Sequence, residues 1–165
     1  MNPAPDQIPA TPPIEPTQKK WALKPFSELT ATELYHILQL RNEVFIVEQN
    51  CPYQDLDNKD LYCHHLMYWY GDRLVAYTRL VPAGISYDTH MSIGRVVSSP
   101  ACRGTGVGKE LMTESIAACY ELFGKAPIRI GAQLYLKKFY EDFGFVQSGE
   151  KYLEDGIEHI EMTKS

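Results

Sequence analysis

The stretch RGTGVG, residues 103–108, follows an apolar run and precedes a segment with helical periodicity. Closely spaced glycines let backbone N–H groups approach an anion, and the helix that follows offers its positive N-terminal end. Arg103 adds a positive charge at the start of the stretch. The local sequence therefore fits a phosphate-binding loop, but it also fits a flexible turn, and the flanking segments must decide between the two.

Two common phosphate-binding motifs do not match this stretch. A P-loop requires Lys-Ser or Lys-Thr after its last glycine, whereas Gly108 is followed by Lys109 and Glu110. The dinucleotide fingerprint G-x-G-x-x-G is not met either, because the glycines stand at positions 104, 106 and 108. The sequence thus disfavours a nucleotide kinase and a Rossmann dehydrogenase.

Hydrophobic periodicity on both sides of the loop predicts an α/β protein with a central mixed sheet. Thr30 and Glu33 fit a capping box at the start of the first helix, and Gly124 closes the helix that follows the loop. The expected elements are a helix over 31–42, a turn-rich loop from 49, a hairpin over 65–82, a strand over 91–97, a helix over about 107–123, a strand over 126–133, a short helix over 134–144 and a hairpin over 145–163.

Composition limits the organisation and location of the chain. The 165 residues fit one domain, but residues 1–20 are rich in proline and poor in large apolar side chains, so we expect a disordered tail there and a single domain over 21–165. The start of the chain lacks the pattern of a signal peptide, and no run of about 18 apolar residues follows. We expect a cytoplasmic protein that contacts no membrane.

Charge and cysteine content exclude two further kinds of partner. The net charge of −5 disfavours nucleic acid as a ligand. The four cysteines stand far apart and form no C-x-x-C pair, so we expect free or buried thiols. Cys63-His64-His65 lacks the further ligands that a zinc site needs, and we expect no metal.

The loop and its flanks together resemble a known family. The strand GRVVSSP, the pattern Arg-x-x-Gly-x-Gly over 103–108 and the following helix resemble the coenzyme A signature of the GNAT acyltransferase superfamily. AQLYLKKFYEDFGF, residues 132–145, resembles the second signature of that superfamily. Residues 38–60, IGRVV and YLEDGIEHIEM also resemble its ElaA subgroup, over about residues 21–163. The resemblance implies a mostly antiparallel sheet, flanked by helices and splayed between its two middle parallel strands.

The resemblance also implies a binding mode for acetyl coenzyme A as co-substrate. The pantetheine arm is expected to pair with the backbone of Val96 and Ser98 between the splayed strands. The pyrophosphate is expected on the glycine loop, mostly through main-chain N–H groups. The residues expected to form this loop site are Arg103, Gly104, Thr105, Gly106, Gly108 and Lys109.

The resemblance points to one residue as the proton donor but leaves the base open. Tyr140 matches the tyrosine of the second signature and is expected to donate a proton to the sulfur of coenzyme A, with a core aromatic as the alternative. Many members carry a carboxylate on the strand that here reads SIGRVV, but this strand has Arg95 instead. Glu48 and His65 remain as candidates for the base, beside a water-relayed path. The alternatives are a solvated charge for Glu48 and a structural role for His65, as a histidine on a strand between apolar neighbours. Asp57 and Asp60 could attract a cationic acceptor or cap turns.

Three functional readings follow from these residues. The leading one is an N-acetyltransferase that acts by direct transfer on a primary amine of a small molecule or peptide. The alternative is a non-catalytic module that binds or senses acyl-coenzyme A, which the missing strand carboxylate favours. The phrase LRNEVF also resembles acyl-homoserine-lactone synthases, but the complete coenzyme A loop ranks that reading lower. GNAT proteins often dimerise, and a homodimer is expected on that ground alone.

Overall fold

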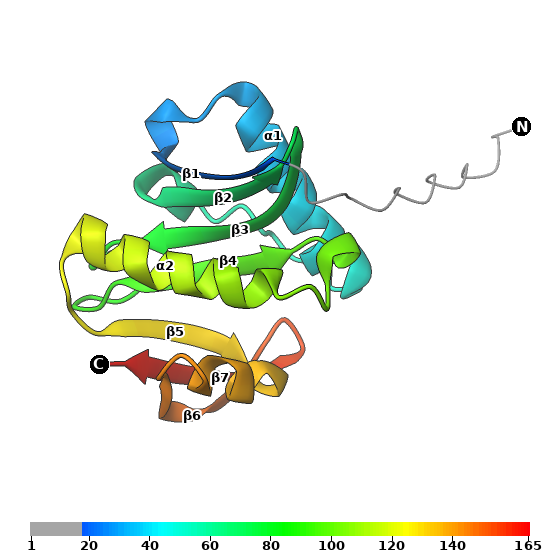
Figure 1. Cartoon of the computed structure of the whole chain (residues 1–165). Coiled ribbons are helices and arrows are strands. Elements are labelled where there is room, and N and C mark those ends of the chain that lie inside the picture. The colour runs from blue at the N-terminus through cyan, green and yellow to red at the C-terminus, as the bar shows by residue number, and fades with distance from the viewer. Residues whose placement is uncertain (1–17) are drawn as a thin grey trace, which may run out of the picture.

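The computed structural model describes residues 18–165 (Figure 1). Its strands are β1 (Lys19–Pro25), β2 (His64–Tyr70), β3 (Arg73–Val81), β4 (Ser92–Ser98), β5 (Ile128–Gln133), β6 (Val146–Glu154) and β7 (Ile157–Lys164). Its α-helices are α1 (Ala31–Arg41), α2 (Val107–Phe123) and α3 (Lys137–Glu141). A π-helical segment, Asn42–Glu48, extends α1, and short 3-10 turns span Phe26–Glu28, Lys59–Tyr62, Pro100–Cys102 and Leu134–Leu136.

The strands form two antiparallel sheets that meet at one point. The first sheet has the order β1-β2-β3-β4, and the second has the order β5-β7-β6. β4 and β5 approach each other in parallel where they begin: Met91 pairs with Ile128, and the amide of Arg129 donates to the carbonyl of Met91 at 3.0 Å. Beyond this point the two strands part (Figure 1). The splayed, mostly antiparallel sheet expected from the sequence is confirmed.

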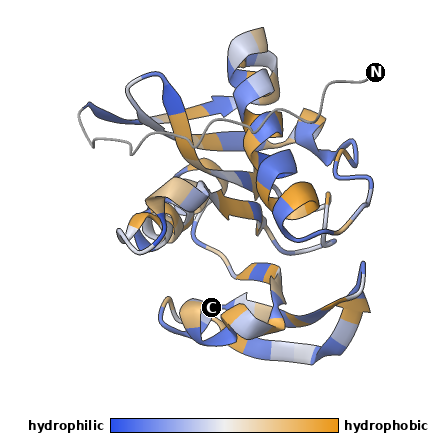
Figure 2. Ribbon diagram, turned by 90° about the vertical axis from the view of Figure 1, so that its right-hand side faces the viewer, coloured by the Kyte–Doolittle hydropathy of each residue, from blue (hydrophilic) through white to orange (hydrophobic). Residues whose placement is uncertain are grey.

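The two longer helices cover opposite faces of the four-stranded sheet. Successive residues of a strand point to opposite faces, so Leu66 and Tyr68 of β2 pack in one core cluster with α2, whereas Met67 packs in the other with Ile37 and Leu40 of α1. Figure 2 shows hydrophobic residues gathered on the central strands and hydrophilic residues in the outer loops. The α2 cluster also includes Ile130 and Ile160 of the second sheet, and it therefore joins both sheets.

The predicted helix boundaries are close to those observed. The hydroxyl of Thr30 accepts from the amide of Glu33 at 3.1 Å, and the Glu33 carboxylate accepts from the amide of Thr30 at 2.9 Å, which is the expected capping box. Gly124 follows the last residue of α2 with a φ of 85°. Each of these helix-end signals involves residues only a few positions apart in the sequence, so the sequence alone is sufficient to predict it.

The N-terminal boundary needs a correction. The tail expected over residues 1–20 lies outside the described residues up to residue 17, but Lys19 and Lys20 belong to β1. They pair with Tyr70 and Trp69 of β2, so strand pairing orders them although their own composition gives no sign of it. β1 as a whole was absent from the predicted order of elements.

Candidate functional site

A cleft of about 870 Å³ opens where β4 and β5 diverge. One part of its wall comes from β4, the start of α2 and the segment from Leu136 to Tyr140. The rest comes from the π-helical extension of α1, the 49–59 loop, Arg79 of β3, the connection before β4, Arg103, β5, Tyr135 and the β6–β7 hairpin. The cleft thus brings together segments from both halves of the chain.

The glycine loop borders the cleft with its two ends, Arg103 and Gly108, and presents free backbone donors. Gly104 and Gly106 have φ values of 76° and 87°, and a Cβ built on either residue would meet open space. The amides of Lys109 and Glu110 donate to the Gly106 carbonyl, but those of residues 104–108 donate no hydrogen bond within the described chain. The side chain of Thr105 donates to the carbonyl of Cys102 and closes the loop. Unoccupied amides at a helix N-terminus are suited to an anion such as a phosphate.

The outer edge of β4 also presents free backbone groups. The amide of Ser99 donates to the carbonyl of Val75 at 2.7 Å, and Val97 pairs with Tyr77. Because backbone groups alternate along a strand, those of Val96 and Ser98 face away from β3, and both residues line the cleft. Arg95 has a φ of 49° where the β3–β4 register shifts, so a bulge precedes this edge. An extended chain could therefore pair with β4 between the two sheets.

Tyr140 lies in the cleft wall with most of its ring buried. Its exposed fraction is 5%, and its ring contacts those of Phe139 and Phe145 at centroid distances of 5.2 and 6.0 Å. Its hydroxyl has no hydrogen-bond partner among residues 18–165. Burial, with a smaller contribution from Tyr135, raises the pKa of Tyr140 above its usual value of 10. The phenol is therefore protonated at neutral pH and can act as a proton donor.

Glu48 and Arg103 form an ion pair at the edge of the cleft. Arg103 Nη1 lies 2.7 Å from Glu48 Oε1, and Nη2 donates to Oε2 at 3.0 Å. Both side chains are about half exposed. The structure therefore joins a predicted phosphate ligand to a predicted base, a pairing that neither residue's sequence context indicates.

His65 lies in the protein interior, away from the cleft. Its side chain is fully buried, Nδ1 shares a hydrogen bond of 2.7 Å with the hydroxyl of Tyr77, and Nε2 lies 2.9 Å from the carbonyl of Asp60. Burial lowers the pKa of His65, and this outweighs the opposite effect of the Asp60 carbonyl and carboxylate. With both ring nitrogens occupied, His65 holds the 49–63 loop against β2 and β3, which matches the structural alternative for a histidine on a strand.

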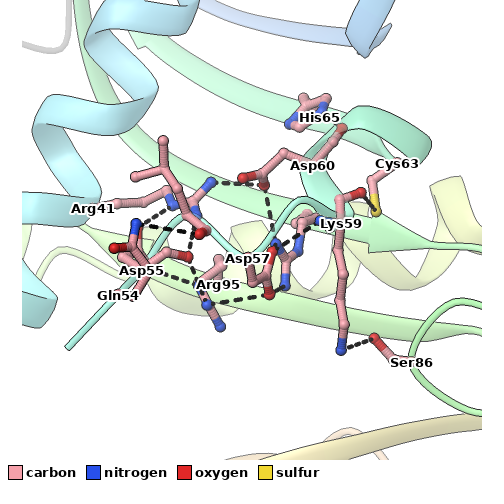
Figure 3. A network of polar contacts seen from close by, with 12 residues as sticks. Arg41, Gln54, Asp55, Asp57, Lys59, Asp60, Cys63, His65, Ser86 and Arg95 are labelled. Atoms are coloured by element: carbon pink, nitrogen blue, oxygen red, sulfur yellow. Dashed lines mark hydrogen bonds and ion pairs between the residues drawn. The ribbon is translucent and has the colours of Figure 1, made fainter.

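A buried ion-pair network fixes the same loop to α1, β3 and β4 (Figure 3). It joins three arginines and three aspartates: Arg41, Arg79, Arg95, Asp55, Asp57 and Asp60. Arg41 is fully buried and contacts Asp55 and Asp60, both at 2.8 Å. The equal number of charges makes the network neutral, which buried ions require.

Arg79 and Arg95 neutralise the carboxylates of the aspartates in the network. Arg79 donates two hydrogen bonds to the carboxylate of Asp57, at 2.7 and 2.9 Å, and a third to Asp60 at 3.1 Å. Arg95 Nε donates to Asp55 at 2.7 Å. Asp57 also caps a turn by accepting from the amide of Lys59. Since Asp57 and Asp60 are neutralised by arginines, they do not offer a free negative charge to a cationic acceptor.

One residue of the cleft wall was missed by sequence reasoning. His159 of β7 lines the cleft and has a side-chain exposure of 11%. Its strand partners are Tyr152 of β6 and Gln133 of β5, which also line the cleft. A hairpin over 145–163 was predicted, and in the structure its two strands place His159 opposite Tyr152. Only the position of the second sheet beside the cleft shows where these side chains point.

The comparisons with known proteins agree with this geometry. A family model of the acetyltransferase (GNAT) domain matches residues 27–165. The chain belongs to the GNAT family. It is 44% identical to Protein ElaA of Escherichia coli strain K12 over 147 residues, which cover 88% of this chain and 95% of ElaA. The resemblance to ElaA and to GNAT proteins expected from the sequence is confirmed.

Solved structures of GNAT proteins share the fold over nearly the whole described chain. The crystal structure of Escherichia coli ElaA has a TM-score of 0.83 and 42% identity, and the match covers 90% of this chain and 100% of that one. An acyl-CoA N-acyltransferase from Pseudomonas aeruginosa has a TM-score of 0.85 and 45% identity, with the same coverage.

Three further observations bear on the ligand classes considered above. All four cysteines are free and buried, as predicted: Cys51, Cys63, Cys102 and Cys119. Residues 18–165 contain no group of three His, Cys, Asp or Glu side chains arranged to hold a metal ion. No helix in the described part of the chain combines the length and the apolar composition needed to cross a bilayer.

Proposed function

We propose that this GNAT protein is an N-acetyltransferase that moves the acetyl group of acetyl coenzyme A directly to a primary amine of a small molecule or peptide. The observation that carries the proposal is the cleft between β4 and β5, which has free loop amides at one end and the phenol of Tyr140 in its wall. The Pseudomonas aeruginosa neighbour is described as an acyl-CoA N-acyltransferase, which supports the same activity here.

The residues present fit acetyl coenzyme A. The pyrophosphate would bind the amides of residues 104–108 and the guanidinium of Arg103, after that guanidinium exchanges Glu48 for phosphate. The pantetheine arm would pair with the free backbone groups of Val96 and Ser98. Bound there, the co-substrate supplies a thioester that an amine can attack.

The chain contributes positioning and a proton. Tyr140 is held between aromatic neighbours, and its raised pKa keeps the hydroxyl protonated, so that a proton is at hand when negative charge develops on the sulfur. We propose that this hydroxyl protonates the departing sulfur. Glu48 is assigned the role of an exchangeable partner of Arg103, and His65 has no catalytic role in this scheme.

Thiol release and acetyl coenzyme A binding, measured on Tyr140→Phe, test the proposal. Each protein is assayed with a panel of four acceptor amines: 1,4-diaminobutane, 2-phenylethylamine, glycinamide and a lysine-containing peptide. We expect thiol release by the wild type, and a fall in kcat of about 100-fold in the variant with an unchanged Kd for acetyl coenzyme A. Tyr120→Phe is the matched control, because Tyr120 of α2 lies outside the cleft lining. Binding without thiol release from any amine would favour the non-catalytic alternative.

A further inference from the structure

We infer that His159 is the general base that takes the proton of the acceptor amine. The inference rests on the proposed acyl transfer and adds the residue that the scheme above lacks. Neither residue first considered for this role fits it: Glu48 lies beside Arg103, at the end of the cleft where the pyrophosphate would bind, and both ring nitrogens of His65 are occupied. His159 is the histidine that lines the cleft among residues 18–165.

One hydrogen bond sets the tautomer of His159. Its Nδ1 lies 2.8 Å from the carbonyl oxygen of Ile157, and a carbonyl can only accept a hydrogen bond. The hydrogen of the neutral ring is therefore on Nδ1, and Nε2 carries a lone pair. A base must have this state before it can accept a proton.

Two neighbours border the ring of His159. Tyr152 stacks on His159 with a centroid distance of 5.6 Å and an interplanar angle of 25°. The carboxylate of Glu154 lies 3.6 Å from Nε2. The arrangement of carbonyl, imidazole and carboxylate orients the base.

The fold places this group on the side of the second sheet that lines the cleft. His159 is paired with Gln133 at the end of β5, and its neighbours along the chain, Glu158 and Ile160, point to the opposite face. Gly131 keeps the same face open for the Tyr152 ring, because a Cβ at position 131 would lie 2.5 Å from the Tyr152 hydroxyl. Tyr87, whose hydroxyl would lie 3.9 Å from the same Cβ, completes an aromatic wall.

The proton balance of the transfer needs such a group. As the bond between the amine nitrogen and the acyl carbon forms, the C–S bond breaks and its electron pair stays on sulfur. Nε2 of His159 accepts one proton from the nitrogen, and the hydroxyl of Tyr140 gives one proton to the sulfur. The products are the amide and the free thiol, with an imidazolium and a phenolate that solvent returns to their starting states.

The test compares His159→Gln, His159→Ala and the control His36→Gln, in which a histidine of α1 outside the cleft lining is replaced. Thiol release is measured with the four-amine panel, and acetyl coenzyme A binding is measured by calorimetry. We expect kcat to fall about 100-fold or more in both His159 variants, while the Kd for acetyl coenzyme A stays within about twofold of the wild-type value. Added imidazole is expected to restore turnover in His159→Ala in proportion to its concentration.

The outcomes separate this inference from the proposed function. Wild-type turnover that persists in His159→Gln, or a loss in His159→Ala that imidazole does not restore, would overturn the role of His159 alone. A wild type that binds acetyl coenzyme A without releasing thiol would overturn the acyl transfer and this inference with it. Glu154→Gln sharpens the result, because a positioning carboxylate should lower kcat by about tenfold without changing that Kd.

Discussion

The protein uses arginine–carboxylate contacts in two regions with opposite properties. In the network around the 49–63 loop, Arg41 is fully buried and is held by the carboxylates of Asp55 and Asp60. At the glycine loop, Arg103 meets Glu48 at the same kind of distance, 2.7 Å, but both side chains are about half exposed. The two contacts have similar geometry, but Arg41 is shielded from solvent whereas Arg103 is exposed to it.

This difference separates a structural role from a binding role. A buried charge that loses its partner has no water to replace it, so the network fixes the loop that borders the cleft. An exposed pair contributes little to stability, because water and salt screen it. Arg103 can therefore exchange its carboxylate for a phosphate, whereas Arg41 cannot change partners without disturbing the fold.

Removal of Arg41 should have the largest effect on stability. Arg41→Leu keeps a good helix former at the end of α1 but removes one of the two arginines that contact each of the buried carboxylates Asp55 and Asp60. We expect the free energy of unfolding, measured by urea denaturation at pH 7, to fall by about 3–5 kcal/mol. Arg103→Leu is the matched control and should change it by less than about 1 kcal/mol. Equal losses in both variants would remove the distinction between the two regions.

Acid should weaken the network through Asp57. Burial raises the pKa of this carboxyl, but the hydrogen bonds and charge of Arg79 outweigh burial and lower it from 3.8 to about 2. A depressed pKa stabilises the fold above about pH 4, and that contribution is lost as the pH falls from about 4 to 2. It amounts to about 2 kcal/mol.

Asp57→Asn should remove this acid dependence. The free energy of unfolding of wild type and variant is measured by urea denaturation at pH 6 and at pH 2. The difference between the two proteins should be about 2 kcal/mol smaller at pH 2 than at pH 6. Asp72→Asn, in the exposed turn between β2 and β3, should give the same difference at both values. A constant difference for Asp57→Asn would show that Arg79 does not hold the Asp57 charge.

Glu48 should have the smallest effect, and it should strengthen binding. If Arg103 must leave Glu48 to reach a phosphate, Glu48→Gln removes the carboxylate that competes with the phosphate for Arg103. An exposed ion pair of this kind contributes less than about 1 kcal/mol. We expect acetyl coenzyme A to bind up to about fivefold more tightly by calorimetry, with the gain decreasing at high salt. Glu114→Gln on α2 matches the charge change and should leave the Kd unaltered. Weaker binding by Glu48→Gln would instead indicate that Glu48 orders the site.

The sequence predicted what short-range signals determine. The capping box of Thr30 and Glu33, the glycine after α2 and the order of the later elements follow from residues a few positions apart. The splayed sheet came from the resemblance to GNAT proteins. β1 was missed because its pairing with β2, whose partner residues lie 39 to 51 positions away, orders it.

The candidate site was predictable in part for the same reason. The glycine loop and Tyr140 lie in local motifs, and the structure places Tyr140 and the two ends of the loop, Arg103 and Gly108, at the cleft. The role of Arg95 as a partner of Asp55, the burial of His65 and the exposure of His159 to the cleft depend on contacts between distant segments. A single sequence carries no direct signal of such contacts.

The glycine loop provides the most direct test of the central claim that this cleft binds acetyl coenzyme A. The measurement is a calorimetric titration of acetyl coenzyme A into wild type, Gly106→Glu and Gly71→Glu, the last being a matched control with positive φ and open space in a turn outside the cleft lining. We predict micromolar binding by wild type and Gly71→Glu, and none by Gly106→Glu. No binding by the folded wild type, or equal binding by Gly106→Glu, would contradict the account.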